Sequence, residues 1–495
     1  MSKPNSLGRL ELTAFLSGAA VMVFEITGSR VLAPYLGTSL FVWTTLIGVI
    51  MASLSLGYWW GGRLADREPS YARLGAILVI AGGLALFTAV AQQSVLSGLQ
   101  QIQLELRLTA LAATLVLFAP ASVLLGMVTP YVARLKLQSI ETAGAHVGRL
   151  YAISTAGSIV GTFAAGYFLM AYLGTSRILY LVAISLIVLS LVVSAQWRIV
   201  ERSALIVFAI LAGLLGEYER VARAEAGLLD LDTSYQRVFV IDTTDKETGR
   251  PVRILRSEDE NTQSAIFLDS EEPVGDYLRC FTKVLDSAGL NNGETASQML
   301  MIGAAGYAYP RYLLQQIPGM HMDVVEIDPA MTEIATQFFQ LQPTKRMQLF
   351  HEDGRTFVNR SGSLYDIAFI DAFQTRVPPF QLLTVEFVQR LADRLHDRGS
   401  IALNLIATPG DRHNGLAAAI ASTYRKVLPH VSMMQVDGSR PLDERQNLVL
   451  WASKAPIPAP SDSTARKGPC AILDAADLQG LVLTDDFAPV EQLVD

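Results

Sequence analysis

Long uncharged stretches are the feature of this sequence that most restricts its fold. Four of them contain no charged residue, at 74–104, 108–133, 150–176 and 178–197. A helix needs about 20 apolar residues to cross the hydrocarbon core of a bilayer, so each stretch predicts one membrane-spanning helix. Residues 12–62 predict two more, separated by a turn near residues 34–38. Because the apolar stretches recur along the chain, they do not form a single cleavable signal peptide.

A further apolar run, 203–216, is short, and it fits a short span, a re-entrant segment or an interfacial helix. Lys and Arg concentrate in the cytoplasmic loops of membrane proteins. This rule places the loops within 63–73 and 134–149 in the cytoplasm. With six spans the rest of the chain is cytoplasmic as well, whereas a seventh span would place it outside.

Two charged residues, Glu25 and Arg30, fall inside the first apolar region. Ionisable groups within a membrane are costly and often functional. The pair either neutralises itself near the membrane surface or lines a functional cavity, and the sequence leaves both alternatives open.

The composition separates a membrane half from a soluble half. Hydrophobic residues make up 51% of the chain and charged residues 17%, which excludes a disordered chain. Residues 1–226 hold 15 Lys and Arg against 10 Asp and Glu, so acidic residues concentrate in the remainder. The net charge of −7 argues against binding to nucleic acid, which needs clustered cations.

Cysteine and histidine usage limits the possible metal and disulfide sites. The two cysteines, Cys280 and Cys470, exclude a framework of several disulfides and a four-cysteine zinc site. The six histidines show no spacing typical of metal ligands. No metal site is therefore predicted.

From residue 228 the sequence alternates short apolar runs with helical patterns. Short strands are predicted at 238–242, 252–255 and 265–268. Buried strands follow at 299–302, 322–326, 347–350, 367–370 and 400–405, with helices at 308–316, 330–339 and 384–394. The sequence thus predicts an α-helical transmembrane bundle at 1–227, followed at 228–455 by an α/β domain with a doubly wound, Rossmann-like sheet and a small N-terminal β subdomain. Residues 456–495, where prolines and serines gather, are expected to form a loop or tail.

Sheets of this kind bind ligands at the carboxyl ends of their strands. A turn of small residues, 303–306, follows the first of the buried strands and would let a cofactor approach the backbone. Acids follow the next three strands, at Glu326, Asp353 and Asp371. Such acids also serve as helix N-caps, yet their common register favours a nucleoside ligand. The chain has neither G-x-G-x-x-G nor G-K-[ST], which favours S-adenosylmethionine or its decarboxylated form over NAD or ATP.

Over nearly all of 228–452 the chain resembles the spermidine synthase family, the polyamine aminopropyltransferases. The matching motifs are Ser234-Tyr235-Gln236, Leu268-Asp269 with Tyr277, the turn 303–306, Val325-Glu326-Ile327-Asp328, Glu352-Asp353-Gly354 and 365–371. The segments 303–311 and 24–35 are similar to the bacterial branch in which a membrane bundle is fused to this domain.

The resemblance implies a role for each site residue. Asp371 is the catalytic general base on the attacking amine. Glu326 binds the ribose of the donor, and Asp353 and Gly354 hold its adenine. The remaining donor-binding residues are Gln236, Tyr277, Gly303 and Ala305, and the acceptor side is formed by Tyr235, Gln374 and Arg376.

Two positions depart from the family pattern. Gly306 and Gln374 stand where family members usually have acids that hold the amine acceptor. The loss of two charge-assisted contacts, each worth about 1.5–3 kcal/mol, puts putrescine in doubt as the acceptor. Arg376 adds a cation that suits a carboxylate on the acceptor or on undecarboxylated S-adenosylmethionine, or it is an ordinary surface residue.

We expect an integral enzyme of the bacterial inner membrane that transfers an aminopropyl-type group to an amine and releases methylthioadenosine. The alternatives are acceptor-independent cleavage or cyclisation of S-adenosylmethionine, methyl transfer, and a transporter or sensor whose domain only binds a ligand. Because both donors are made in the cytoplasm, the catalytic domain is expected there, with 203–216 not completing a crossing. A homodimer follows from the family by analogy.

Overall fold

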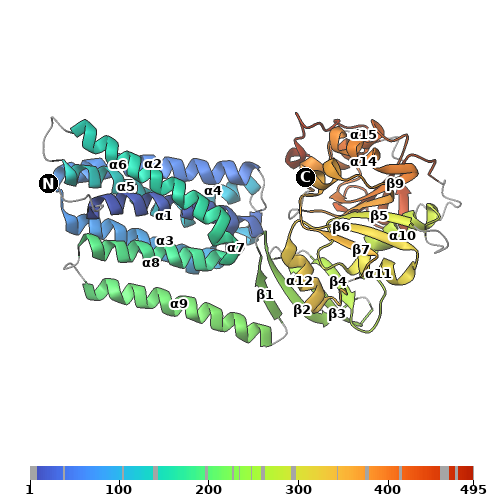
Figure 1. The fold of residues 1–495 in the computed structure, drawn as a ribbon, viewed down its shortest axis with the longest axis horizontal. Helices are drawn as coiled ribbons and strands as arrows, with labels where there is room; N and C mark the ends of the chain where they lie inside the picture. Colours follow the sequence, from blue (N-terminus) through green and yellow to red (C-terminus); the bar gives the residue numbers. More distant parts are fainter. Residues whose placement is uncertain are drawn as a thin grey trace. The chain divides into compact units, whose positions relative to one another are not determined.

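A computed structural model of the chain shows two compact units, Met1–Arg237 and Val238–Asp495 (Figure 1). It describes residues 8–493 except 37–39, 103–104, 138–142, 195–198, 226–227, 234, 247, 258–261, 291–296, 343, 374–377, 412–414, 458–467 and 474–477. The division between the units lies later than the predicted boundary at 227, because the first strand of the small β subdomain groups with the bundle.

The first unit is a bundle of long apolar helices. They are α1 (Arg9–Leu36), α2 (Leu40–Arg67), α3 (Tyr71–Gln101), α4 (Leu106–Leu117), α5 (Ala119–Lys136), α6 (Ala143–Phe163), a π-helical turn (Ala164–Leu169), α7 (Met170–Tyr172), α8 (Thr175–Val193) and α9 (Ile199–Glu225). Among the described residues, five helices are long and apolar enough to cross a membrane, or six if α4 and α5, which are bent by 52°, form one span. The strand β1 (Leu228–Asp232) follows α9.

Glycines allow the helices of the bundle to pack closely. A Cβ atom at Gly57 of α2 would collide with the carbonyl oxygen of Val123 in α5. A Cβ at Gly157 of α6 would meet the carbonyl oxygen of Phe15 in α1 in the same way. Close backbone approach at small residues is how helices associate in lipid, where there is no hydrophobic driving force between them.

The second unit begins with an antiparallel meander and a helix. The strands are β2 (Arg237–Thr244), β3 (Pro251–Ser257) and β4 (Thr262–Phe267), and α10 (Asp276–Ser287) follows them. The three strands match the predicted β subdomain, with each strand somewhat longer than the apolar run that predicted it.

The main body of this unit is a mixed sheet with the strand order β12-β10-β11-β9-β8-β5-β6-β7. Its strands are β5 (Ser297–Ile302), β6 (Met320–Val325), β7 (Met347–Phe350), β8 (Tyr365–Ile370), β9 (Leu395–Ala407), β10 (His430–Asp437), β11 (Gln446–Ser453) and β12 (Pro469–Leu473). The strands β5 to β9 pair in parallel, and β10 to β12 extend the sheet antiparallel beyond β9. The five predicted buried strands are the parallel ones.

Three of the following helices of this unit start after a residue whose side chain caps them. The helices are α11 (Ala308–Gln316), α12 (Pro329–Phe338), α13 (Gly354–Arg360), α14 (Val385–Ala392) and α15 (Leu416–Arg425). Asp328 accepts a hydrogen bond from the backbone N–H of Ala330, directly before α12. Asp353 and Thr384 cap α13 and α14 in the same manner. Side chains of α13, α14 and α15 bury one face of the sheet.

The C-terminal segment 456–495 differs from the predicted loop. It contributes the edge strand β12, and Leu478, Leu483 and Val490 are buried in the core of the domain. A disulfide joins Cys470 of β12 to Cys280 of α10. The prolines and serines at the start of this segment are typical of a loop, whereas the apolar residues that follow them form the strand and the buried contacts.

Candidate active site

The candidate site lies where the order of the parallel strands reverses. From β5 the chain continues outward to β6 and β7, and it then returns to place β8 on the other side of β5. Gly303 follows β5 and Asp371 follows β8, and the N–H of Asp371 donates to the carbonyl oxygen of Ile302 at 2.8 Å. Ligands of open α/β sheets bind at such a switch point.

The turn after β5 requires glycine at its first position. Gly303 has a φ of +82°, and a Cβ there would collide with the carbonyl oxygen of Asp371. The turn also holds Ala305 and Tyr307 at φ values of 45° and 56°, which non-glycine residues adopt rarely. Strained backbone of this kind is common where a chain passes close to a ligand.

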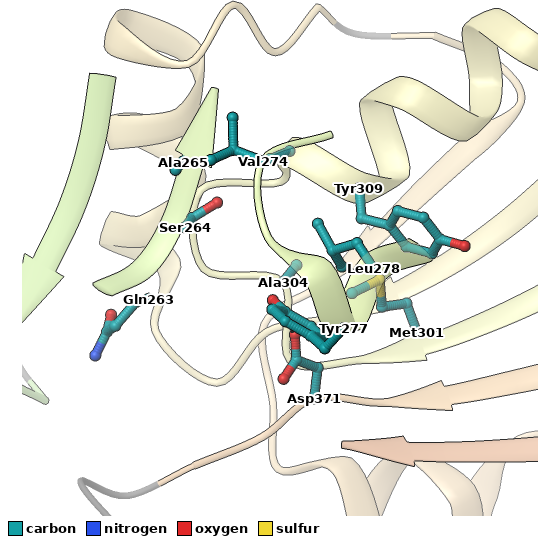
Figure 2. Close-up of a pocket in the computed structure, with 11 residues that line it drawn as sticks. Gln263, Ser264, Ala265, Val274, Tyr277, Leu278, Met301, Ala304, Tyr309 and Asp371 are labelled. Carbon is teal, nitrogen blue, oxygen red and sulfur yellow. The ribbon is translucent and has the colours of Figure 1, made fainter. Parts of the chain in front are cut away.

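Both carboxylate oxygens of Asp371 are held by neighbouring side chains. The hydroxyl of Tyr277, on α10, donates to Oδ2 at 2.9 Å, and Nδ2 of Asn404, on β9, donates to Oδ1 at 2.9 Å. Figure 2 shows the Tyr277 hydroxyl beside the Asp371 carboxylate at the pocket wall. The carboxylate is thereby fixed in one orientation.

The surroundings raise the pKa of Asp371 above its ordinary value. Burial of the carboxylate is the main cause, the hydrogen bonds from Asn404 and Tyr277 oppose it, and the charge of Glu326 adds to it. Burial and the charge of Asp371 raise the pKa of Tyr277 well above its usual range. Tyr277 therefore stays protonated and acts as a hydrogen-bond donor, while Asp371 is a carboxylate suited to accept a proton.

Glu326, at the end of β6, is 8% exposed and joins two segments of the site. Its Oε2 accepts hydrogen bonds from the N–H groups of Ala304 at 3.0 Å and Ala305 at 3.1 Å. Its Oε1 accepts from the N–H of Asp328 at 3.1 Å. The carboxylate thus holds the turn after β5 in place, and the binding of a ribose by Glu326 stays a prediction.

Asp353 and Gly354 lie after β7, as predicted, and both have visible structural roles. Oδ1 of Asp353 accepts a hydrogen bond from the N–H of Thr356 at 2.9 Å and so caps α13. A Cβ at Gly354 would collide with the side chain of Ile302. These contacts place the pair beside the end of β5, and their contact with an adenine remains untested.

The pocket beside Asp371 is lined by both polar and apolar side chains. Among the described residues that line it, Asp371 is the one carboxylate; the others are Gln263, Ser264, Ala265, Val274, Tyr277, Leu278, Met301, Ala304, Ala308 and Tyr309. Gly306 packs closely against β4, since a Cβ there would lie 2.7 Å from Oγ of Ser264. The fold therefore leaves no space at position 306 for an acidic side chain.

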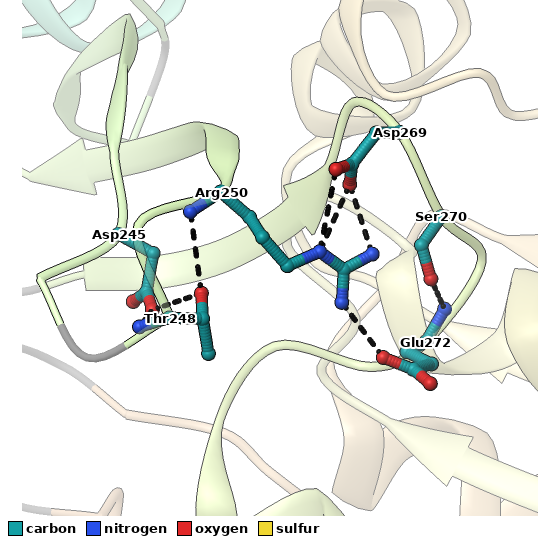
Figure 3. Close-up of polar contacts among 6 residues, drawn as sticks. All are labelled: Asp245, Thr248, Arg250, Asp269, Ser270 and Glu272. Carbon is teal, nitrogen blue, oxygen red and sulfur yellow. Dashed lines mark hydrogen bonds and ion pairs between the residues drawn. The ribbon is translucent and has the colours of Figure 1, made fainter.

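An arginine holds the loop that leads from β4 to α10. The Arg250 guanidinium binds Asp269 through Nη2 at 2.9 Å and Glu272 through Nη1 at 2.8 Å (Figure 3). The backbone N–H of Arg250 donates to Oγ1 of Thr248, and the hydroxyl of Thr248 donates to Oδ1 of Asp245. This loop carries Val274 to the pocket and leads directly to Tyr277, so Arg250 supports one wall of the site.

The structure does not test the predicted roles of four site residues, Tyr235, Gln236, Gln374 and Arg376. Gln374 and Arg376 lie outside the described residues. Tyr235 and Gln236 belong to the first unit, where Thr233 orders their turn by bonding to the backbone of Gln236. Their roles therefore remain predictions.

Sequence reasoning missed Asn404, which directly contacts the proposed catalytic carboxylate. Its one signal was a polar residue within the apolar run 401–406 of a buried strand. No group of three or more His, Cys, Asp or Glu within the part of the chain that the structure describes could hold a metal ion.

Comparisons with known proteins relate the chain to two classes of transferase. No family model matches it. A polyamine aminopropyltransferase of Vibrio vulnificus (strain CMCP6) is 32% identical over 143 residues, which cover 28% of this chain and 46% of the relative. A probable polyamine aminopropyl transferase of Bifidobacterium longum (strain NCC 2705) is 26% identical over 223 residues, 40% of this chain and 49% of the relative. The chain thus spans about half the length of these relatives.

A methyltransferase is also similar in sequence. The eEF1A lysine and N-terminal methyltransferase of Bos taurus is 27% identical over 156 residues, 29% of this chain and 22% of the relative. Among solved structures, a probable spermidine synthase from Corynebacterium glutamicum ATCC 13032 aligns with a TM-score of 0.43 and 17% identity over 50% of this chain and 93% of that one. The spermidine synthase from Thermotoga maritima aligns with a TM-score of 0.35 and 19% identity over 46% and 72%.

Proposed function

We propose that the Val238–Asp495 domain is an aminopropyltransferase-like enzyme and that the first unit is integral to a membrane. The observation that carries the enzymatic proposal is the position of Asp371. It is a carboxylate of raised pKa, fixed through both oxygens, at the switch point of the sheet. The relatives named polyamine aminopropyltransferases support the same class.

The co-substrate is a sulfonium nucleoside, either decarboxylated S-adenosylmethionine or S-adenosylmethionine itself. The turn after β5 offers it a closely approachable backbone, and Glu326 and Asp353 follow the next two strands. The absence of a phosphate-binding motif from the sequence agrees with a nucleoside that carries no phosphate.

In the transfer reaction, the lone pair of an uncharged amine attacks the carbon next to the sulfonium sulfur. The new C–N bond forms as the C–S bond breaks, and the electron pair of that bond neutralises the sulfur of methylthioadenosine. The proton released by the amine passes to Asp371. Because the sulfonium is already an activated leaving group, the protein's main tasks are to align the amine and to accept this proton.

Acceptor-independent cleavage or cyclisation of S-adenosylmethionine is the second candidate. The packing of Gly306 against Ser264 and the single carboxylate among the described lining residues favour it, because a dicationic amine would find few anionic partners there. In the cyclisation, a nucleophile of the substrate itself attacks the same carbon and again releases methylthioadenosine. Methyl transfer, the activity in the name of the bovine relative, would release adenosylhomocysteine instead.

The test is to incubate the purified full-length protein with each donor, with and without a panel of amines, and to identify the nucleoside product by mass spectrometry. Methylthioadenosine formed only when decarboxylated donor and amine are both present is the expected result. Its formation from S-adenosylmethionine alone would favour the second candidate. Adenosylhomocysteine, or no product from either donor, would refute both.

A matched pair of variants links the activity to the site. Asp371→Asn keeps the shape of the side chain but removes the base, so turnover should fall by about 10²–10⁴-fold. Asp397→Asn makes the same chemical change at an exposed position of β9 and should retain activity. A transporter or sensor that only binds the nucleoside would bind it equally well in both variants and turn over in neither.

A further inference from the structure

The helix α9 is long enough to cross a membrane and contains the apolar run 203–216, although it is not among the described helices that qualify as spans by length and composition alone. The run 203–216 lies within a helix of 27 residues, which rises about 40 Å, whereas the hydrocarbon core is about 30 Å thick. Between residues 204 and 215 its exposed side chains are apolar, including Val207 at 54% exposure, Leu211 at 58% and Leu215 at 59%. A continuous apolar surface of this kind suits lipid and is costly in water.

Contacts show at which end of the bundle α9 begins. Nη1 of Arg202, a residue that is 1% exposed, donates to the carbonyl oxygens of Ser190 at 2.7 Å and Ser194 at 2.9 Å. These carbonyls lie at the end of α8. Because α9 packs against α8 and starts where α8 ends, it runs back along the bundle (Figure 1).

The chain leaves the bundle at the opposite end, where α8 begins. Oδ2 of Asp232 accepts a hydrogen bond from the N–H of Thr175, the first residue of α8, at 3.0 Å. Oδ1 of Asp232 pairs with Nη2 of Arg30 at 3.2 Å, and Nη1 of Arg30 donates to the carbonyl oxygen of Met170. Arg30, predicted either to pair with Glu25 or to line a cavity, thus holds the exit of the chain.

The two ends of the bundle differ in cationic residues. The loops at the end where α9 begins are flanked by Arg63, Arg67 and Arg73, by Arg134, Lys136 and Arg149, and by Arg198. At the exit end the loops 37–39, 102–105 and 173–174 contain no Lys or Arg, and the cations beside them are fewer: Arg30, Arg107 and Arg177. In the sequence of the last turns of α9, Arg220 and Arg223 are offset by Glu217, Glu219 and Glu225. The positive-inside rule therefore makes the exit end extracytoplasmic.

The disulfide is an independent observation that points the same way. Cys280 and Cys470, the only cysteines of the sequence, are bonded to each other within the Val238–Asp495 domain. Disulfides form and persist in oxidising compartments and are rare in the cytosol.

We propose that α9 is a seventh membrane span and that the Val238–Asp495 domain lies on the extracytoplasmic side of the membrane. This placement is opposite to the expectation drawn from the cytoplasmic synthesis of the donors, and it does not rest on the proposed reaction. It places that reaction after a transport step: a sulfonium nucleoside is a permanent cation, which does not cross hydrocarbon unaided, so a transport reaction must supply it.

Cysteine accessibility in cells tests the proposal with the full-length chain. Lys246→Cys places a thiol on an exposed turn of the domain, and Ala145→Cys places one at the exposed start of α6, at the cationic end of the bundle. The native cysteines are bonded to each other and do not react. A membrane-impermeant maleimide is added to cells with a permeable outer membrane, and a cytosolic thiol protein reports that the inner membrane stayed sealed.

The expected result is that K246C is labelled in sealed cells and A145C only after lysis. If K246C reacts only after lysis, the domain is cytoplasmic and the proposal is wrong. Labelling of both thiols in sealed cells also overturns it, because the two positions would then share one side and α9 would not cross.

The oxidation state of the wild-type chain provides a second measurement. Cells are quenched in acid, and the denatured protein is treated with a mass-tagged maleimide. The proposal expects no tag without reductant and two tags after reduction. Two tags without reductant would contradict it. Neither measurement uses turnover, so failure of the proposed reaction and failure of the proposed topology can be told apart.

Discussion

Asn404 and Asp371 meet across two neighbouring parallel strands, with Nδ2 of the amide 2.9 Å from Oδ1 of the carboxylate. Asn404 is 4% exposed, and its Oδ1 has no hydrogen-bond partner among the described residues. A buried amide with one unsatisfied oxygen costs stability. Its hydrogen bond to Oδ1 fixes the orientation of the Asp371 carboxylate, so Asn404 is a positioning residue.

Replacing Asn404 by leucine should lower turnover and shift its pH dependence. The Asn404 hydrogen bond lowers the pKa of Asp371, so its loss raises that pKa further. A general base works only when deprotonated, so the acid limb of the pH profile of kcat should move to higher pH. Loss of one hydrogen bond to a charged group, about 1.5 kcal/mol, corresponds to roughly a tenfold loss of kcat near neutral pH.

The control for this variant is Asn359→Leu, on the exposed face of α13. It should leave both kcat and the pH profile unchanged. An Asn404→Leu enzyme that changes KM alone, with the acid limb unmoved, would show that Asn404 does not act through Asp371.

Tyr277→Phe removes the second donor to Asp371 while keeping the ring that packs against Phe281. The Tyr277 hydrogen bond also lowers the pKa of Asp371, so the acid limb of kcat should again move to higher pH. Because both donors bind one carboxylate, the effects of Tyr277→Phe and Asn404→Leu should not be additive in the double variant. The matched control is Tyr312→Phe, which removes a hydroxyl from a half-buried ring outside the pocket lining.

The parts of the site that could be predicted follow from local sequence. Glu326 and Asp371 each end an apolar run, and a run that ends in an acid marks both a buried strand and its carboxyl end. Asn404 could not be predicted in the same way, because it lies inside a strand and its partner is 33 residues away. The bond between Cys280 and Cys470 spans 190 residues, and no local pattern reports such a pairing.

The bundle shows a similar limit. Five of the six predicted spans are helices that are long and apolar enough to cross a membrane, and the run 108–133 forms the bent pair of α4 and α5. The run 203–216 is short in the sequence because charged residues flank it. In the structure the guanidinium of Arg202 is buried against α8, and the helix extends beyond the run. The carbonyl oxygens that accept hydrogen bonds from Arg202 are brought to it by the packing of two helices. A hydropathy pattern cannot predict such contacts.

Gly303→Ala should disrupt both the fold and the activity of the domain. The new Cβ would collide with the carbonyl oxygen of Asp371, and alanine at a φ of +82° is strained. Strain of this kind costs of the order of 1–3 kcal/mol, and the collision would displace the catalytic carboxylate. Thermal unfolding and turnover measure the two effects. Gly362→Ala, where a Cβ meets nothing within 4 Å, should change neither.

Gly57→Leu should weaken the bundle, because α2 and α5 approach each other backbone to backbone at this position. A large side chain there would force the helices apart. Gly48→Leu, on the same helix, adds the same side chain at a position with nothing within 4 Å. The yield of folded protein in detergent and its unfolding temperature should fall for Gly57→Leu and stay at the wild-type level for Gly48→Leu. Equal behaviour of the two variants would argue against close α2–α5 packing.

Removal of the disulfide should destabilise the Val238–Asp495 domain without removing any residue that contacts the pocket. The bond closes a loop of 190 residues and ties the edge strand β12 to α10, the helix that carries Tyr277. The loss of a native disulfide costs about 2–5 kcal/mol, chiefly because the unfolded chain becomes freer. Reductant should therefore lower the unfolding temperature of the wild-type protein, and Cys470→Ala should show the lower value with or without reductant.

If reductant lowers the unfolding temperatures of both proteins by the same amount, it acts at a place other than the disulfide. If it lowers neither unfolding temperature, the disulfide contributes no stability. Because α10 keeps its contacts with Phe369 through Phe281, turnover below the new unfolding temperature should persist.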